Sequence, residues 1–501
     1  MGMVDFIKKF GREITTILSA KEELWKEPSK FNPLDDLVLI NKECGYFGRN
    51  HTRADNKAVQ IPSEAINHIL LCGITRSGKG IMASIKGVEA IQKGKGLIYI
   101  DVKQEEWTPQ CFIEELERQN RKEDFLLVNW PNDFGYTGLN SDDTIFEIHE
   151  KAIVLLDLGL SSEAGVDHYR ENERMTFFRI LEEGLNKHFK PDWYEILHFI
   201  ECLIEDFDAQ AEYAKEYSKS KPNHDRLEEL SHRYFDTALL KKLKFRPKNI
   251  DALSSLYIKL SETLSGASVC KTISIDEALY NGKVVYIKAD MLSLQSLKFL
   301  KLLFIDMTQK ARKKKANTLV IADEISFYAT VLLSAQLSVS AGFGLQFILQ
   351  LQDLGQLPAE LRNPILTNCS AKLYYKISTS DTLDEVERLG GEEAIRIWST
   401  SMTSNTEDTV RAGTEPLLNA TRIRAMWYAR NAIFIAEYLN TSIFIQTSSI
   451  PVKHPFDWNS AKIETKVSVE KREKQKKFEV KIEAKNDDEK LSFGGGGDDD
   501  F

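Results

Sequence analysis

Two segments of the chain carry residues whose types and spacing suit phosphate chemistry. The first comprises Gly73, Ile74, Thr75, Arg76, Ser77, Gly78, Lys79 and Gly80, and it follows the apolar run Ile69–Cys72. Glycines in such a loop let backbone N–H groups close around a polyphosphate, and the lysine then reaches the β- and γ-phosphates. A helical pattern over residues 81–92 follows, as this type of loop requires. The segment therefore predicts a nucleotide-binding loop with Lys79 as a phosphate ligand.

The second segment is the apolar run 318–322, which ends in Asp323 and Glu324. In nucleotide-hydrolysing enzymes an acid at this place holds Mg²⁺, directly or through water, and a neighbouring acid polarises the attacking water. We therefore predict Asp323 as the metal ligand and Glu324 as the catalytic residue that activates the attacking water. Together the two segments indicate a nucleotide-driven motor that uses ATP and Mg²⁺.

Gly80 departs from the usual pattern. The last position of the loop is ordinarily Ser or Thr, whose hydroxyl binds Mg²⁺. Thr75, Ser77 or Ser84 could replace that hydroxyl, or a water molecule could take its place. Otherwise the protein would bind nucleotide and hydrolyse it poorly.

Composition limits the class of protein. The net charge of −9 over 501 residues argues against a uniformly basic nucleic-acid coat, although a ring could still grip DNA with a few loops. Six scattered cysteines without a C-x-x-C pair indicate reduced thiols in a cytoplasmic protein. No secretory signal or membrane-length apolar run is visible. An amphipathic pattern around Phe6, Phe10 and Ile14 predicts a helix that either packs on its own domain or lies on a membrane or partner.

The pattern of apolar residues changes along the chain. Strand patterns alternate with helical ones in two regions, as a parallel α/β sheet requires, and a long helical stretch separates them. We predict the following organisation: residues 1–60, an amphipathic helix and irregular lead-in; 61–145, the first part of a nucleotide-binding domain; 146–268, an inserted all-α domain; 269–455, the second part of the nucleotide-binding domain; and 456–501, a disordered tail with an acidic tip.

The order of these segments resembles the TraD/TraG family of type IV secretion coupling proteins, within the FtsK/HerA-like P-loop superfamily. The resemblance covers roughly residues 60–450. Besides the loop and the two acids, it is carried by the strand end Asp101–Lys103 and by the segment 342–357, which contains Gln352 and Gln356. It implies a RecA-like P-loop ATPase that forms a hexamer, with Gln352 sensing the γ-phosphate. It also implies an arginine supplied by the neighbouring subunit, for which Arg362 and Arg388 are candidates.

The resemblance also implies partners and a place in the cell. The cargo would be a relaxase bound to single-stranded DNA, handed to a conjugative type IV secretion channel at the cytoplasmic face of a bacterial inner membrane. Family members usually begin with transmembrane helices, so a membrane partner would anchor this chain, or it would belong to a soluble subgroup. Two basic runs, 241–248 and 312–315, could contact phosphates, although a solvated helix end is the simpler interpretation of the second.

The last residues of the chain are similar to tails that dock on relaxosome accessory proteins. A glycine run precedes Asp498, Asp499, Asp500 and Phe501, and an acidic tip with a terminal aromatic residue suits a basic pocket. A merely solubilising tail is the alternative. Two other functions remain open for the whole chain: a non-conjugative DNA translocase of the same superfamily, and a nucleotide-gated adaptor with little hydrolysis.

Overall fold

The structure is a computed structural model. It describes residues 29–51, 56–129, 138–159, 164–219, 221–232, 247–264, 274–390, 392–400, 408–416, 418, 420–424, 428–439 and 441–458. The predicted N-terminal amphipathic helix, residues 241–246 of the basic run 241–248, and the acidic tip 498–501 lie outside these residues.

A mixed sheet of eleven strands forms the centre of the described fold. Its order is β2-β1-β13-β12-β9-β3-β8-β7-β4-β6-β5, and β9 through β5 run parallel while β12, β13, β1 and β2 extend the sheet in antiparallel fashion. The strands are β1 Cys44–Asn50, β2 Ala58–Pro62, β3 Ile69–Cys72, β4 Gly96–Asp101, β5 Phe125–Asn129, β6 Val284–Lys288, β7 Thr318–Ala322, β8 Leu345–Leu351, β9 Ala371–Tyr374, β12 Asn431–Ala436 and β13 Thr441–Gln446.

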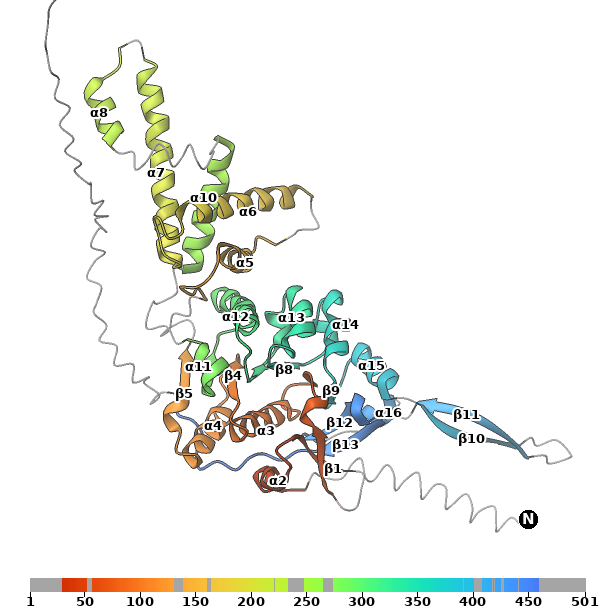
Figure 1. Ribbon diagram of the computed structural model, residues 1–501. Helices are drawn as coiled ribbons and strands as arrows, with labels where there is room; N and C mark the ends of the chain where they lie inside the picture. The colour runs from red at the N-terminus through yellow and green to blue at the C-terminus, as the bar shows by residue number, and fades with distance from the viewer. Residues whose placement is uncertain are drawn as a thin grey trace, which may run out of the picture. The chain divides into compact units, whose positions relative to one another are not determined.

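Alternation along the strands creates two apolar layers, because successive side chains point to opposite faces of a sheet. On one face Leu71 and Tyr99 pack with α3 (Lys79–Gln92) and α4 (Trp107–Arg118). On the other, Leu70 and Ile100 pack with α12 (Leu294–Lys313), α13 (Leu332–Ser340) and α14 (Ala359–Asn368). Figure 1 shows these two groups of helices on opposite sides of the strands. Strands buried on both faces are typical of parallel α/β sheets.

A helical segment leaves the sheet after β5. Its helices are α5 Ile145–Leu155, α6 Ala164–Gly184, α7 Trp193–Tyr217, α8 His224–His232 and α10 Pro247–Leu264. The chain returns through α11 (Asp276–Asn281) to β6, which lies next to β5. α10 packs on α6 and α7, and α5 packs on α12, so the apolar core of the helical segment continues into one face of the sheet.

The predicted α/β fold class with a large parallel sheet is confirmed, but two groups of strands were not predicted. The expected irregular lead-in before residue 61 is wrong, because β1 pairs with β13 and β2 and so extends the central sheet. Beyond β9, β10 (Glu392–Thr400) and β11 (Asp408–Pro416) form a separate antiparallel hairpin, labelled in Figure 1.

Shorter elements complete the described chain. They are α2 Pro33–Leu39, α15 Ser380–Gly390, α16 Ala420–Arg424, and the 3-10 helices η1 Ser63–Ala65, η2 Lys122–Asp124, η3 Ile325–Phe327, η4 Leu354–Gln356 and η5 Glu437–Leu439. None of the helices in the described part of the chain combines the length and apolarity that crossing a membrane requires.

Candidate nucleotide-binding site

The loop 73–80 leaves the carboxyl end of β3, a strand that lies between β8 and β9. The Gly73 N–H donates to Leu351 O of β8 at 3.2 Å, and the Ile74 N–H donates to Lys376 O, just after β9, at 3.0 Å. Gly78 has a φ of 115°, and a Cβ atom there would lie 3.0 Å from the backbone N and Cα of Arg430. Glycine is therefore required at this position, both for its conformation and for the close approach of the two backbones.

Lys79 begins α3 and is buried. Its ammonium group donates to Gly73 O and, at 3.3 Å, to Ile74 O, so it bonds to carbonyls of its own loop. Burial lowers the pKa of Lys79, and the nearby Glu324 carboxylate opposes that shift. The side chain is thus held in place beside the loop backbone.

Asp323 and Glu324 follow β7 at the same edge of the sheet, where the carboxyl ends of parallel strands bind ligands. Lys103, which follows β4, reaches both acids: its Nζ lies 3.2 Å from Asp323 Oδ1 and 2.5 Å from Glu324 Oε1. Gln352, directly after β8, donates from Nε2 to Glu324 Oε1 at 3.1 Å. The structure thus brings three of the predicted residues together around one lysine.

The electrostatics of this cluster follow from burial and pairing. The pKa of Asp323 is raised to about 7, chiefly by burial and also by the charges of Glu324 and Glu105, whereas Lys103 opposes the shift. Burial alone would lower the pKa of Lys103, but Asp323 and Glu324 outweigh it and the pKa is raised. Lys103 is therefore a charged side chain that partly neutralises the two acids.

Glu324 also has an unusual backbone. Its φ of 44° and ψ of 52° lie in the left-handed region, which costs about 1–3 kcal/mol for a residue other than glycine. The neighbouring turn supports this conformation, because the buried Tyr328 hydroxyl donates to Asp323 O at 2.7 Å. Glu324 Oε2 is buried and accepts no hydrogen bond, so one oxygen of this carboxylate has no partner.

Asp101 organises the turn that carries Lys103. Its buried carboxylate accepts backbone hydrogen bonds, each 2.8 Å long, from Lys103, Gln104 and Glu105. It also accepts a 2.7 Å bond from the Tyr286 hydroxyl. Burial raises the pKa of Asp101 even though these bonds favour its charged form. The predicted strand end 101–103 thus positions a lysine toward the acids of the next strand.

The side chains at this edge fit a bound Mg²⁺. Mg²⁺ in nucleotide sites takes one or two carboxylates together with phosphate oxygens and water. Asp323 offers such a carboxylate, and Ser77 Oγ is buried without a hydrogen-bond partner. Ser84 is engaged elsewhere, since its hydroxyl donates to Gly80 O at 2.8 Å, and Thr75 is exposed. Among the described residues, no group of three or more His, Cys, Asp or Glu side chains could hold a metal ion by itself. Mg²⁺ at this edge would therefore need phosphate oxygens or water as further ligands.

Comparison with known proteins agrees with this geometry. A family model described as the TraM recognition site of TraD and TraG matches residues 317–427, which include Asp323, Glu324 and Gln352. The chain is TraD/TraG-like. No curated protein sequence matches it.

Solved structures of the bacterial conjugative coupling protein TrwB share the fold of this TraD/TraG-like chain, that of a RecA-like P-loop protein. The trigonal form in complex with sulphate gives a TM-score of 0.55 at 14% identity, covering 86% of this chain and 96% of that chain. The complex with the ATP analogue ADPNP gives 0.53 at 14% identity, covering 87% and 97%. The complex with ADP and Mg²⁺ gives 0.51 at 14% identity, covering 79% and 89%.

The two candidate trans-acting arginines of the TraD/TraG-like chain have partners within their own subunit. Arg362 on α14 lies 3.4 Å from Asp381 Oδ2, and Arg388 on α15 lies 2.5 Å from Glu385 Oε1. Their side chains are 34% and 67% exposed, so each could turn toward another subunit. Their proposed role needs a neighbouring copy and stays a prediction.

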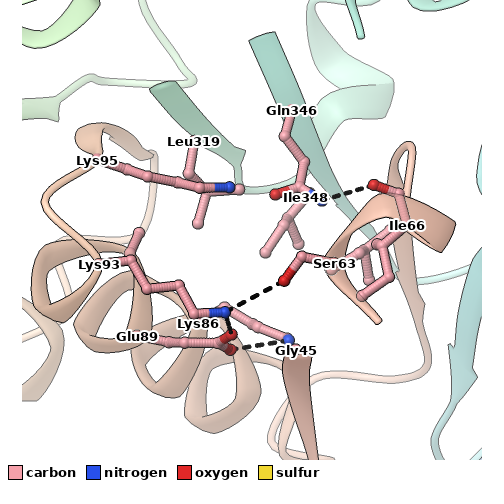
Figure 2. A pocket seen from close by; sticks show the side chains of 12 residues that line it. Gly45, Ser63, Ile66, Lys86, Glu89, Lys93, Lys95, Leu319, Gln346 and Ile348 are labelled. Atoms are coloured by element: carbon pink, nitrogen blue, oxygen red, sulfur yellow. Dashed lines mark hydrogen bonds and ion pairs between the residues drawn. The ribbon is translucent and has the colours of Figure 1, made fainter. Parts of the chain in front are cut away.

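A small cavity of the TraD/TraG-like chain lies at the amino ends of the strands, opposite the edge that carries the loop 73–80 (Figure 2). Its volume of about 30 Å³ has room for water and not for a nucleotide. Lys86 and Lys93 both bind Glu89 there, at 2.9 and 2.6 Å, and Lys93 also lies 3.4 Å from Ser63 Oγ. This cluster ties α3 to the chain before it.

One acid at the nucleotide edge was not predicted from the sequence. Glu105 lies beside Gly80 and accepts a 2.7 Å hydrogen bond from the Thr108 hydroxyl. The signal that could have found it is an acid two residues after the lysine of the strand end 101–103.

Proposed function

We propose that this TraD/TraG-like protein is the ATPase coupling protein of a conjugative type IV secretion system. The observation that carries the proposal is the convergence of Lys79, Asp323, Glu324 and Gln352 at the carboxyl edge of a TrwB-like sheet. TrwB structures are described with ADP and Mg²⁺ and with ADPNP, which supports ATP and Mg²⁺ as the ligands of this chain.

In the proposed reaction, water attacks the γ-phosphorus of ATP and the bond to the β–γ bridging oxygen breaks. Glu324 receives the proton of the water, for which its unpaired, buried Oε2 is suited. Lys79 leaves its loop carbonyls for the phosphates, and Gln352 transmits the state of the γ-phosphate through its bond to Glu324. Mg²⁺, held by Asp323, would neutralise developing charge on the phosphates.

The proposed partners are a relaxosome and a secretion channel. The family model over 317–427 is described as a TraM recognition site, which supports contact with a relaxosome component. The tail Asp498–Phe501 would be a further contact for the accessory protein. We propose that the protein forms a homo-hexamer in the bacterial cytoplasm, held at the inner membrane by the secretion channel or another membrane partner. The hexamer would move single-stranded DNA, with its relaxase, into that channel.

The test is the ATPase rate with and without single-stranded DNA. Wild type should hydrolyse ATP faster with DNA, and both Lys79→Ala and Glu324→Gln should lose at least ~100-fold of the stimulated rate, since they remove a phosphate ligand and the acceptor of the proton. Lys187→Ala, an exposed position on the helical segment, is the matched control and should keep full activity. A wild type that hydrolyses ATP equally without any partner DNA would argue against a DNA motor.

Gly80 favours one other function, a nucleotide-gated adaptor. Such an adaptor would bind ATP without turnover even with DNA, and Glu324→Gln would leave its affinity unchanged. A non-conjugative DNA translocase would instead show DNA-stimulated turnover, but the complete chain would bind chromosomal repair factors and fail to bind a purified relaxosome.

A further inference from the structure

Gly80 lies against a carboxylate. It occupies the first turn of α3, and a Cβ atom built there would lie 2.9 Å from Glu105 Oε1 and 3.2 Å from Glu105 Oε2. Contacts below 3.0 Å are not tolerated by real Cβ atoms, so any side chain at position 80 would displace this carboxylate. The space that a Ser or Thr hydroxyl uses in the common loop is therefore bordered here by two carboxylate oxygens.

Glu105 is held in this position from two sides. Its backbone N–H donates to Asp101 Oδ2 at 2.8 Å, and the Thr108 hydroxyl donates to its Oε2 at 2.7 Å. Thr108 is in turn 2.9 Å from Ser84 Oγ on α3, so a line of hydroxyls connects the turn after β4 to the helix after the loop. Thr108 bonds to Oε2, and the other oxygen, Oε1, is the nearer of the two to the site of the missing side chain.

Glu105 also shares its surroundings with the predicted metal acid. β4 and β7 are adjacent, and the Asp323 N–H donates to Ile100 O at 3.2 Å. The charge of Glu105 is close enough to contribute to the raised pKa of Asp323. Asp323 is almost fully buried whereas Glu105 is partly open to solvent. The buried, unpartnered Ser77 Oγ of the same loop is a further oxygen without an internal role.

We propose that Glu105 supplies the oxygen ligand for nucleotide-bound Mg²⁺ that Gly80 cannot supply. This inference rests on the proposed nucleotide site and adds a second carboxylate to it. Two carboxylates together with phosphate oxygens and water are a usual set for Mg²⁺. Glycine at position 80 is then the residue that lets the carboxylate approach, and it is no longer a defect of the loop.

A purely structural role for Glu105 makes a different prediction. Glu105 precedes Glu106, the N-cap residue of α4. In a structural role it would only bind Thr108 and so support the first turn of this helix. Glu105→Gln keeps an oxygen for Thr108 but removes the charge, so it separates the two roles. Glu106→Gln, at the exposed adjacent position, removes the same charge without a contact to Gly80 and is the matched control.

The experiment measures the affinity of the full chain for a fluorescent ATP analogue, in Mg²⁺ and in EDTA. The gain in affinity that Mg²⁺ gives wild type should fall ~10-fold or more in Glu105→Gln, with binding in EDTA unchanged, and should persist in Glu106→Gln. Glu105→Ala should also lose the gain, and Gly80→Ser combined with Glu105→Ala should recover it, because the serine restores the common ligand.

The outcomes distinguish the inference from the function on which it rests. A wild type that binds no nucleotide would overturn both. A Mg²⁺ gain that survives in Glu105→Gln, or that Glu106→Gln loses equally, would overturn the inference alone. A loss in Glu105→Gln without recovery by Gly80→Ser in the Glu105→Ala background would assign Glu105 a structural role and also overturn it.

Discussion

Two lysines at the nucleotide edge are bound to groups of the protein itself. Lys79 donates to loop carbonyls and Lys103 bridges Asp323 and Glu324. Both contacts must rearrange if phosphates and a metal ion occupy this edge, because the phosphates need Lys79 and the metal needs Asp323. The nucleotide-free arrangement is therefore stabilised by hydrogen bonds of Lys79 and ion pairs of Lys103 that the ligand replaces.

The positions of the loop and of the two acids at the ends of their strands could be predicted, because each follows directly from a short local pattern, and their roles stay predictions. The contact of Lys103 with Asp323 could not, since it joins residues 220 positions apart and depends on the pairing of β4 with β7. The same holds for Glu105 and Gly80, which become neighbours only when α3 and the turn after β4 meet. Local sequence predicts which residues can do chemistry; the order of the strands decides which of them meet.

The burial of His68 predicts how the stability of the folded protein depends on pH. It is fully buried, its Nε2 lies 2.8 Å from Leu337 O, and its Nδ1 accepts from the Phe347 N–H at 3.1 Å. Burial lowers the pKa of His68, although the Leu337 carbonyl opposes this. The folded protein therefore binds this proton less readily than the unfolded chain, so its stabilising effect is present above pH ~6.5 and is lost as pH falls through the lowered pKa.

We expect the free energy of unfolding of wild type to fall as pH decreases below ~6.5, by at most ~1.4 kcal/mol per pH unit from this group, and the unfolding temperature to fall with it. His68→Gln should be less stable at pH 8 but should lose less stability between pH 8 and pH 5.5. The exposed His454→Gln serves as the control and should follow wild type. Identical pH slopes for wild type and His68→Gln would contradict the prediction.

At the scale of elements, a buried ion-pair cluster connects helix α5 of the helical segment to helix α12, which packs on the sheet. Lys151 of α5 is completely buried and lies 2.6 Å from Asp143 Oδ2 and 2.8 Å from Asp306 Oδ1 of α12. Asn140 also donates to Asp306 at 2.9 Å. Because such charges are costly to bury unless each has its partner, this contact requires α5 and α12 to pack together in one arrangement.

Lys151→Met should destabilise the protein by about 3–5 kcal/mol, because it removes the nearest cation from two buried carboxylates, Asp143 and Asp306, and Lys313 lies farther from Asp143 Oδ1, at 3.8 Å. Urea denaturation should show a lower midpoint, and adding Asp143→Asn and Asp306→Asn to Lys151→Met should recover part of the loss. Lys187→Met, at a surface pair with Glu183, should leave the midpoint nearly unchanged. A Lys151→Met protein as stable as wild type would show that this ion-pair cluster does not stabilise the packing of α5 on α12.

Elements with strong periodic patterns agree with the structure, and those without them were missed. The helical pattern predicted over 146–268 contains α7 (Trp193–Tyr217), which an Asp192 cap begins. The hairpin of β10 and β11 was not recognised, because β11 has few apolar residues and the two strands form a sheet of their own. β1 contains Gly45 and Gly48, which weaken a strand signal, and it is completed only by β13 from the far end of the chain.

At the scale of the whole molecule, the proposed ring makes each nucleotide site depend on two subunits. A trans-acting arginine and a cis-acting lysine can then be separated by mixing variants. Arg362→Ala retains Lys79, and Lys79→Ala retains Arg362. If Arg362 acts in trans, each pure variant should have little DNA-stimulated ATPase activity, whereas an equimolar mixture should recover up to about a quarter of the wild-type rate, because random mixing completes that share of the sites.

The same mixture made with Arg388→Ala tests the second candidate. Recovery with one arginine variant and not with the other would identify the residue that completes the neighbouring site. An arginine variant that keeps full activity by itself has no such role. Mixtures that never exceed the average of their components would contradict a site shared between subunits.

The position of β3 in the sheet has a consequence for how the protein is made. β3 pairs with β8 and β9, in which Ile348 and Ala371 lie opposite Ile69. Neither edge of β3 can therefore be paired until these later strands have been synthesised. At ordinary rates of translation that interval lasts roughly 15–60 s, during which four apolar residues have no strand partner. The nucleotide-binding loop therefore takes shape only after most of the chain has left the ribosome, and a nascent chain should depend on chaperones until then.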